Sequence, residues 1–176
     1  MPNTRDRDGS TRATRRSVLL GAAAGAIGAS AMGMLLRSPA EAAGTFEVTR
    51  TDEEWRRLFT PAQYDVLRKH GTERAGSSPL DREKRTGTFL CAGCDLDVFG
   101  SADKFDSGTG WPSFTRPIEG AVATSEDRGW FMTRTEVHCR RCGGHLGHVF
   151  DDGPNPTGLR YCMNGVAMAF TASATS

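Results

Sequence analysis

Two Cys-x-x-Cys pairs restrict the fold of this chain more than any other feature: Cys91 with Cys94, and Cys139 with Cys142. The small or polar middle residues of "CAGC" and "CRRC" suit tight turns in which both sulfurs point inward. Two such turns supply the four thiolates of a tetrahedral zinc site. Because the pairs are further apart than in compact zinc ribbons, a layer of β structure must lie between them. We therefore expect a structural zinc ion that joins distant segments.

Other uses of these cysteines stay open. In an exported protein each pair could be oxidised to a disulfide, or one pair could be a redox Cys-x-x-Cys motif, although a redox pair usually follows a strand and opens a helix. His145 or His148 could also be a ligand, because "CRRCGGHLGH" continues the three-residue spacing. Four thiolates already close a structural site, so we favour zinc on cysteine alone.

The first 42 residues have the layout of an export signal. Five arginines precede an Ala/Gly-rich apolar run over residues 18–36, and "PAEA" follows it. The "TRRSVLL" stretch resembles a twin-arginine signal, so we expect cleavage after Ala42 and a periplasmic or other extracytoplasmic domain over residues 43–176. The alternative is an uncleaved membrane anchor, since the run is about long enough to span a bilayer. Its four glycines weaken a spanning helix, so we expect only a transient contact with the membrane.

The charge of the remaining domain argues against a nucleic-acid partner. Of the 22 basic and 21 acidic residues, six and three lie in residues 1–42, which leaves 16 and 18. A near-neutral domain without a basic stripe lacks the clustered Lys and Arg that neutralise phosphates. About 134 residues are enough for one hydrophobic core without a disulfide framework.

Short helices are expected before a mainly β domain. Thr51 and Glu54 form a capping box, and a second helix begins with Thr60 as its cap and Pro61 in its first turn, and stops at Gly71. From residue 86 onward, Gly, Pro, Asp and Ser separate short runs that predict strands and hairpins. These runs are "TGTFLC", "AVATSE", "GWFMTRTEVHC", "HLGHVF" and "GLRYCMNGVAMAF".

Cys162 is the cysteine left over. If "RYCMN" is a strand, Arg160, Cys162 and Asn164 share one face, because side chains alternate along a strand. A neighbouring arginine lowers the pKa of a thiol and favours the nucleophilic thiolate. The alternative is a buried cysteine that acts as a small hydrophobic residue, but Arg and Asn on the same face argue against a dry core. We therefore expect a reactive thiol.

Several motifs around the cysteine pairs resemble the methionine-R-sulfoxide reductases of the B type. They are "FDSGTGWPSF", "HLGHVFDDGPNPTG" and "RYCMNG", with "KHGTER" before them, and the resemblance covers roughly Glu47 to Thr171. It implies a zinc-bearing, mainly β fold of antiparallel, sandwich-like sheets. It also implies reduction of the R epimer of methionine sulfoxide, chiefly in oxidised proteins.

The resemblance implies roles for four catalytic residues. Cys162, as thiolate, would attack the sulfoxide sulfur and become a sulfenic acid as methionine is released. His145 and His148 would protonate the departing oxygen, because the pKa of histidine lies close to working pH. Asn164 would help to orient that oxygen.

Three further residues are expected to contact substrate. Trp111 would give an apolar wall for the S-methyl group, with Phe114 nearby, and Arg160 would lie beside the thiol. From the residues alone, Trp111 could equally fill the core, because it precedes a proline in a Gly-rich loop.

The chain departs from the family pattern at three positions. Thr109 stands where many members carry a resolving cysteine, so we expect a thioredoxin-like protein or a small thiol to reduce the sulfenic acid directly. Gly165 replaces a usual serine and Ala169 an often basic residue, and lost hydrogen bonds there would loosen the strand of Cys162. Two rival functions are a zinc-stabilised binding module on the same fold and an exported redox carrier that uses one Cys-x-x-Cys pair.

Overall fold

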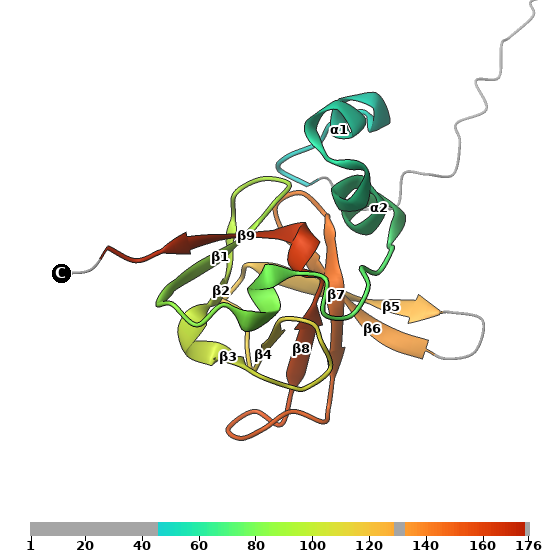
Figure 1. The fold of residues 1–176 in the computed structure, drawn as a ribbon. Helices are drawn as coiled ribbons and strands as arrows, with labels where there is room; N and C mark the ends of the chain where they lie inside the picture. The colour runs from blue at the N-terminus through green and yellow to red at the C-terminus, as the bar shows by residue number, and fades with distance from the viewer. Residues whose placement is uncertain (1–45, 129–132, 175–176) are drawn as a thin grey trace, which may run out of the picture. The chain divides into compact units, whose positions relative to one another are not determined.

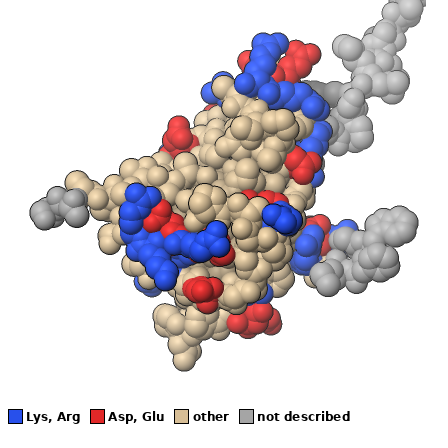
Figure 2. Space-filling model, viewed as in Figure 1, with Lys and Arg blue, Asp and Glu red and all other residues tan. Residues whose placement is uncertain are grey.

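A computed structural model of the chain describes residues 46–128 and 133–174 (Figure 1). The predicted export signal lies outside the described residues, and so do the first four residues of the predicted strand "GWFMTRTEVHC". Within the described part, no helix combines the length and the apolar character needed to cross a membrane. On the face seen in Figure 2, basic and acidic side chains lie in small neighbouring clusters between uncharged areas.

The two predicted helices are present, as α1 (Asp52–Leu58) and α2 (Pro61–Lys69). Both begin with a capping box, in which Thr51 pairs with Glu54 and Thr60 with Gln63. The end of α2 differs from the prediction, because the left-handed residue is His70 rather than Gly71. Gly71 is needed for close approach instead, since a Cβ there would collide with the Asp65 carboxylate.

The β structure forms two antiparallel sheets, as predicted. The small sheet has the order β2-β1-β9 and the large sheet the order β3-β4-β8-β7-β6-β5. The strands are β1 (Gly87–Cys91), β2 (Asp97–Gly100), β3 (Lys104–Phe105), β4 (Ser113–Phe114), β5 (Val122–Arg128), β6 (Thr133–Cys139), β7 (His145–Phe150), β8 (Arg160–Met163) and β9 (Met168–Ala172).

Short 3-10 helices lie between these elements: η1 (Pro79–Arg82) precedes β1, η2 (Ser101–Asp103) joins β2 to β3, and η3 (Gly165–Ala167) joins β8 to β9. The last predicted run, "GLRYCMNGVAMAF", is divided by η3. Its first half, β8, lies in the large sheet and its second half, β9, in the small one. Asn164 precedes η3 and is not a strand residue, so the run is two strands rather than one.

Stacked aromatic rings form the centre of the core. The Phe114 ring lies 4.4 Å from that of Phe99 and 4.9 Å from that of Phe89, measured between centroids. All three side chains are fully buried. Buried residues of the helices, among them Trp55, Tyr64 and Leu67, belong to the same cluster. Phe114 of β4 and Met163 of β8 belong to this core, which anchors the strand that carries Cys162.

Candidate active site and four-cysteine centre

The four paired cysteines come together from both sheets. Cys91 ends β1 and Cys139 ends β6, while Cys94 and Cys142 lie in the turns that follow these strands. The four Sγ atoms lie within 4.8 Å of one another, with 3.6 Å between Cys91 and Cys142 and 3.5 Å between Cys94 and Cys139. Sulfurs around a tetrahedral zinc ion are about 3.8 Å apart, given Zn–S bonds of about 2.3 Å. The cluster is therefore a potential metal centre whose donors fit zinc.

The same distances argue against the disulfide alternative. All four thiols are free, and the contacts of 3.6 and 3.5 Å join sulfurs of different Cys-x-x-Cys turns. The separations also far exceed the roughly 2.05 Å of a sulfur–sulfur bond. Glycines allow this crowding: a Cβ at Gly93 or Gly144 would lie 3.1 or 3.3 Å from the Cys142 Sγ.

A separate small pocket surrounds Cys162. Its volume is about 130 Å³, and it is lined by Thr72, Trp111, Arg134, Gly147, His148, Phe150, Cys162 and Asn164. Four of the predicted site residues are therefore brought together around one cavity. Phe114, Arg160 and His145 do not line it.

The position of Cys162 follows from the register of the large sheet. On β8 it pairs with Ser113 of β4 on one side and with His148 of β7 on the other. The Thr109 hydroxyl lies 4.0 Å from the Cys162 Sγ. The side chain of Phe114, the next residue on β4, packs in the core, because successive residues point to opposite faces of a strand. The prediction that Phe114 contacts substrate is therefore not supported.

Arg160 lowers the pKa of Cys162, as predicted, but the effect of burial is larger. Burial raises the pKa of Cys162, and the Thr109 hydroxyl and the Arg160 charge offset this only in part. Arg160 also makes two hydrogen bonds, of 2.7 and 2.8 Å, to the Asp152 carboxylate. Its guanidinium also stacks on Phe150, 4.5 Å from the ring centre. The sequence correctly placed Arg160 near Cys162, but it could not show that Arg160 also pairs with Asp152.

The raised pKa predicts how Cys162 reacts with iodoacetamide. Only the thiolate is alkylated, so the rate should rise through the neutral range and reach half its maximum above pH 9.0, the ordinary pKa of a thiol. Arg160→Gln removes a charge that favours the thiolate, so its curve should move to still higher pH. Mass spectrometry of the Cys162 peptide from zinc-loaded protein measures both. A midpoint below pH 9.0 in the parent protein would show that burial does not dominate.

His148 is paired with a carboxylate that sequence reasoning missed. Its Nε2 lies 2.8 Å from the Asp127 Oδ2, and Arg134 donates to the same oxygen at 2.7 Å. Burial lowers the pKa of His148, and the Asp127 contact opposes this. At neutral pH the imidazole opposite Cys162 is therefore mostly uncharged, and so is the thiol.

His145 lies deeper, behind the ring of His148. The two ring centres are 5.2 Å apart, and His145 is only 1% exposed. Its Nδ1 lies 2.7 Å from the Glu136 Oε1, and within the described residues its Nε2 has no partner. Residues three apart on a strand normally face opposite ways. Here a bulge gives β7 one extra residue, Leu146, opposite β6, and this brings the two rings together.

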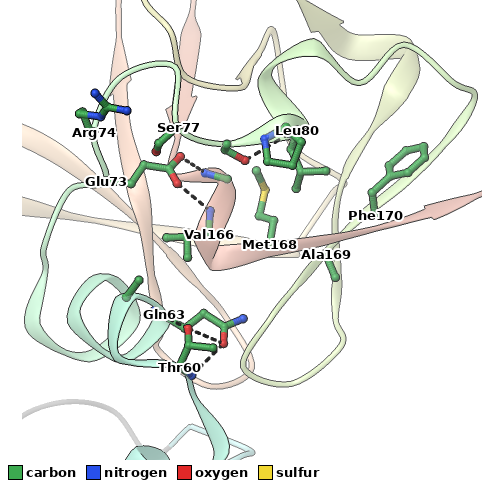
Figure 3. Close-up of a pocket in the computed structure, with 14 residues that line it drawn as sticks. Thr60, Gln63, Glu73, Arg74, Ser77, Leu80, Val166, Met168, Ala169 and Phe170 are labelled. Carbon is green, nitrogen blue, oxygen red and sulfur yellow. Dashed lines mark hydrogen bonds between the residues drawn. The ribbon is translucent and has the colours of Figure 1, made fainter.

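Glu73 is a further residue that sequence reasoning left without a role, although it is part of "KHGTER". Its backbone carbonyl accepts the indole N–H of Trp111 at 3.1 Å, and its backbone N–H donates to the Asn164 Oδ1 at 3.0 Å. Its carboxylate accepts the backbone N–H groups of Gly165 and Val166 (Figure 3). Glu73 thus fixes two residues of the pocket and the turn after β8.

Asn164 reaches the pocket by a different route from the one predicted. It does not share a strand face with Cys162, because it begins the turn into η3. Its Nδ2 donates to the Leu146 carbonyl at 3.1 Å. A side-chain amide has two N–H groups, so one remains for an oxygen bound in the pocket.

Comparisons with known proteins agree with this site. The family model of the SelR domain matches residues 59–172. Proteins named peptide methionine sulfoxide reductase MsrB are similar: that of Leptospira interrogans is 48% identical over 126 residues, 71% of this chain and 96% of the relative. That of Agrobacterium fabrum is 51% identical over 125 residues, covering 70% and 93%. That of Pseudomonas putida is 53% identical over 125 residues, covering 70% and 94%.

This chain belongs to the MsrB family. The membership confirms the family and the enzyme class that the sequence motifs predicted. The departures from the MsrB pattern can now be placed in the structure, and Gly165 is the more informative of those after Asn164.

Packing explains why this MsrB chain has glycine at position 165. A Cβ there would overlap the Ser78 side chain, so the serine usual at this position does not fit. The backbone N–H of Gly165 is held by Glu73 instead. Ala169 is exposed on β9 in the small sheet, away from β8. Both residues line a larger groove of about 680 Å³, drawn in Figure 3. The loosening predicted for the Cys162 strand is therefore opposed at Gly165 by a replacement contact.

Proposed function

We propose that this chain reduces the R epimer of methionine sulfoxide in proteins, with Cys162 as the nucleophile. The observation that supports this best is the arrangement of Cys162, His148, Asn164 and Trp111 around one small pocket in a chain of the MsrB family. The relatives carry the name peptide methionine sulfoxide reductase. The R epimer and the steps below are our proposal.

Before substrate binds, Cys162 is a protonated thiol. The pKa of Cys162 is raised by burial and that of His148 is lowered by burial, so thiol and neutral imidazole face each other across β7 and β8. We propose that His148 accepts the thiol proton as Cys162 attacks the sulfoxide sulfur, and then delivers it to the oxygen. The protonated oxygen then passes to the Cys162 sulfur as the substrate S–O bond and the transient S–S bond break, so methionine leaves and Cys162 becomes a sulfenic acid.

His145 and Asp127 support His148 in this scheme. Asp127 holds the Nε2 of His148 at 2.8 Å and stabilises the charged imidazolium once it forms. His145, paired with Glu136, stands 5.2 Å behind it, ring to ring, and supplies a second proton-carrying group. Asn164 donates its remaining N–H to the sulfoxide oxygen.

Trp111 forms the apolar wall for the S-methyl group. Its indole N–H is bound to the Glu73 carbonyl at 3.1 Å, which fixes the ring in place. Phe150 lines the same pocket and is held by the Arg160 stack. We therefore assign Arg160 a part in shaping the pocket through Phe150 rather than a direct contact with substrate.

Regeneration requires a thiol from outside the chain. Thr109 lies 4.0 Å from the Cys162 Sγ, but a hydroxyl cannot form a disulfide with the sulfenic acid. The other four cysteines face one another at the four-cysteine centre. We propose that a thiol of a thioredoxin-like protein, or a small thiol, attacks the sulfenic acid and releases water. The second thiol of that protein, or a second small thiol, then reduces the mixed disulfide and is left oxidised as a disulfide.

We also propose that zinc occupies the four-cysteine centre and that residues 1–42 direct export. Cys91, Cys94, Cys139 and Cys142 would hold the ion, and its contribution is structural, since four thiolates leave no open position for substrate. The twin-arginine-like motif supports export of the folded protein, in which case zinc can bind before the thiols meet an oxidising compartment.

An epimer-resolved assay tests the function. Zinc-loaded protein is given a peptide with each epimer of methionine sulfoxide separately, with dithiothreitol or with thioredoxin and its reductase. We expect methionine from the R epimer and essentially none from the S epimer, because the Trp111 wall and the oxygen-binding groups fix one handedness. Equal turnover of both epimers would contradict the proposed binding mode, and no turnover of either would favour the binding-module alternative.

A further inference from the structure

All four histidines of the chain gather around Glu136 or its neighbours. His70 and His145 each place Nδ1 near the same carboxylate oxygen, Oε1, at 2.9 and 2.7 Å. The Nδ1 atom of His138 lies 3.9 Å from the other oxygen, and the rings of His148 and His145 pack edge to face. The reaction proposed above uses only part of this cluster, and His70 has no role in it.

The three closest groups lie near enough to share one metal ion. One ring nitrogen each of His70 and His145 and one carboxylate oxygen of Glu136 lie within 4.8 Å of one another. Neighbouring ligands around a tetrahedral zinc ion with bonds of about 2.0–2.1 Å are roughly 3.3–3.4 Å apart. The two Nδ1–Oε1 separations, 2.9 and 2.7 Å, are hydrogen-bond distances, and each must lengthen by about 0.4–0.7 Å when an ion enters between the donors.

The cluster is also accessible from solvent on one side. His70 follows the last residue of α2 and its side chain is 64% exposed, whereas those of Glu136 and His145 are 10% and 1% exposed. An ion can therefore enter past His70 and reach two buried donors.

We propose that His70, Glu136 and His145 form a second metal site, which takes a divalent transition-metal ion such as Zn²⁺. Two imidazoles and one carboxylate are donors that suit zinc, with water in the remaining position. Binding moves each imidazole proton from Nδ1 to Nε2, so that both Nδ1 lone pairs face the ion. The site differs from the four-cysteine centre in its ligands and in its exposure.

Occupancy of this site has a consequence for catalysis, which rests on the function proposed above. The ion replaces the hydrogen bond between His145 and Glu136 and holds the His145 imidazole in place behind His148. Zinc therefore inhibits reduction reversibly, and His70 is the residue that sets the sensitivity. His70 itself lies outside the proposed catalytic machinery, so its replacement leaves the uninhibited rate unchanged.

Zinc binding is measured first without any activity. The protein carries Cys162→Ser, so that the four-cysteine centre is filled and no free thiol competes, and equilibrium dialysis against micromolar Zn²⁺ is followed by metal analysis. We expect one additional zinc per chain. His70→Asn should raise the half-saturating zinc concentration at least about tenfold, and asparagine suits the left-handed backbone of this position. Lys69→Asn, an exposed change one residue earlier, should bind as the parent does.

Nitrogen-15 NMR identifies the ligands. The Nδ1 resonances of His70 and His145 should shift on addition of zinc, while that of His138 should not. Absence of a second zinc, or retention of full affinity in His70→Asn, would overturn the proposal irrespective of what the enzyme reduces.

Inhibition is measured in a single turnover of pre-reduced protein, because dithiothreitol would chelate the metal. Zinc should slow methionine formation in the parent and in Lys69→Asn but not in His70→Asn at the same concentration. Equal inhibition of all three would show that zinc acts through Cys162 instead, and would overturn the regulatory part of the proposal even if the second ion binds.

Discussion

Cys162→Ser should abolish sulfoxide reduction while the fold and the metal content stay unchanged. Serine has an oxygen where cysteine has the larger sulfur and is otherwise identical. The hydroxyls of Thr109 and Ser113 already lie beside this side chain. A hydroxyl, however, cannot accept the sulfoxide oxygen as a thiol does. We expect the rate to fall by at least about a thousandfold, as for other nucleophile replacements.

Two measurements accompany this variant. Zinc stoichiometry and the thermal unfolding midpoint should match those of the parent protein, which separates loss of the nucleophile from loss of the fold. Trapping with dimedone should label Cys162 in the parent after one turnover and leave the variant unlabelled. Turnover within tenfold of the parent rate would place the nucleophile elsewhere and remove the basis of the proposed mechanism.

Cys139→Ser should prevent stable folding. Cys139 is fully buried at the end of β6, and its loss leaves three thiolates at a centre that connects the two sheets. Structural zinc contributes roughly 10–16 kcal/mol in small zinc domains, whereas whole domains are stable by only about 5–15 kcal/mol. We expect little soluble protein, less than one zinc per chain and no cooperative thermal transition.

The paired result with Cys162→Ser makes this prediction specific. Both variants replace one cysteine by serine, yet only Cys139→Ser should lose both the metal and the folded structure. Chelation of zinc from the parent protein should reproduce the Cys139→Ser behaviour. A metal-free parent that melts at the same temperature as the loaded one would show that the four thiols stabilise the fold without an ion.

Local features of this chain could be predicted from sequence because their causes are local. The capping boxes of α1 and α2 join residues three apart, so the letters Thr51, Glu54 and Thr60 suffice to locate them. The spacing within each Cys-x-x-Cys turn likewise fixes two sulfurs on one side. The meeting of both turns followed from zinc chemistry, which needs four donors.

Features that depend on strand register could not be predicted. Glu136 lies next to His145 because β6 pairs with β7 through a bulge at Leu146. No residue type in either strand predicts that bulge. Asp127 reaches His148 across two strand pairings. A carboxylate such as that of Asp127 can be predicted as the partner of His148 only once the strand order β5-β6-β7 is known.

The sign of the Cys162 shift shows the same limit. Sequence placed Arg160 two residues away and correctly predicted a favourable charge, but burial by β4 and β7 is tertiary and outweighs it. The face of Asn164 and the core position of Phe114 were misjudged for a related reason: the chain leaves the strand after Met163, and two-residue β4 turns Phe114 inward.

The size of the Cys162 pocket limits which oxidised proteins this chain can serve. About 130 Å³ is well below the roughly 300–1,000 Å³ of a typical small-molecule site, so only the tip of a side chain enters and the peptide backbone stays outside. Under the proposed function, a damaged methionine must therefore protrude from its own protein before it is repaired. Oxidation makes that side chain polar and drives it out of hydrophobic cores, so the lesion itself tends to present the residue to the enzyme.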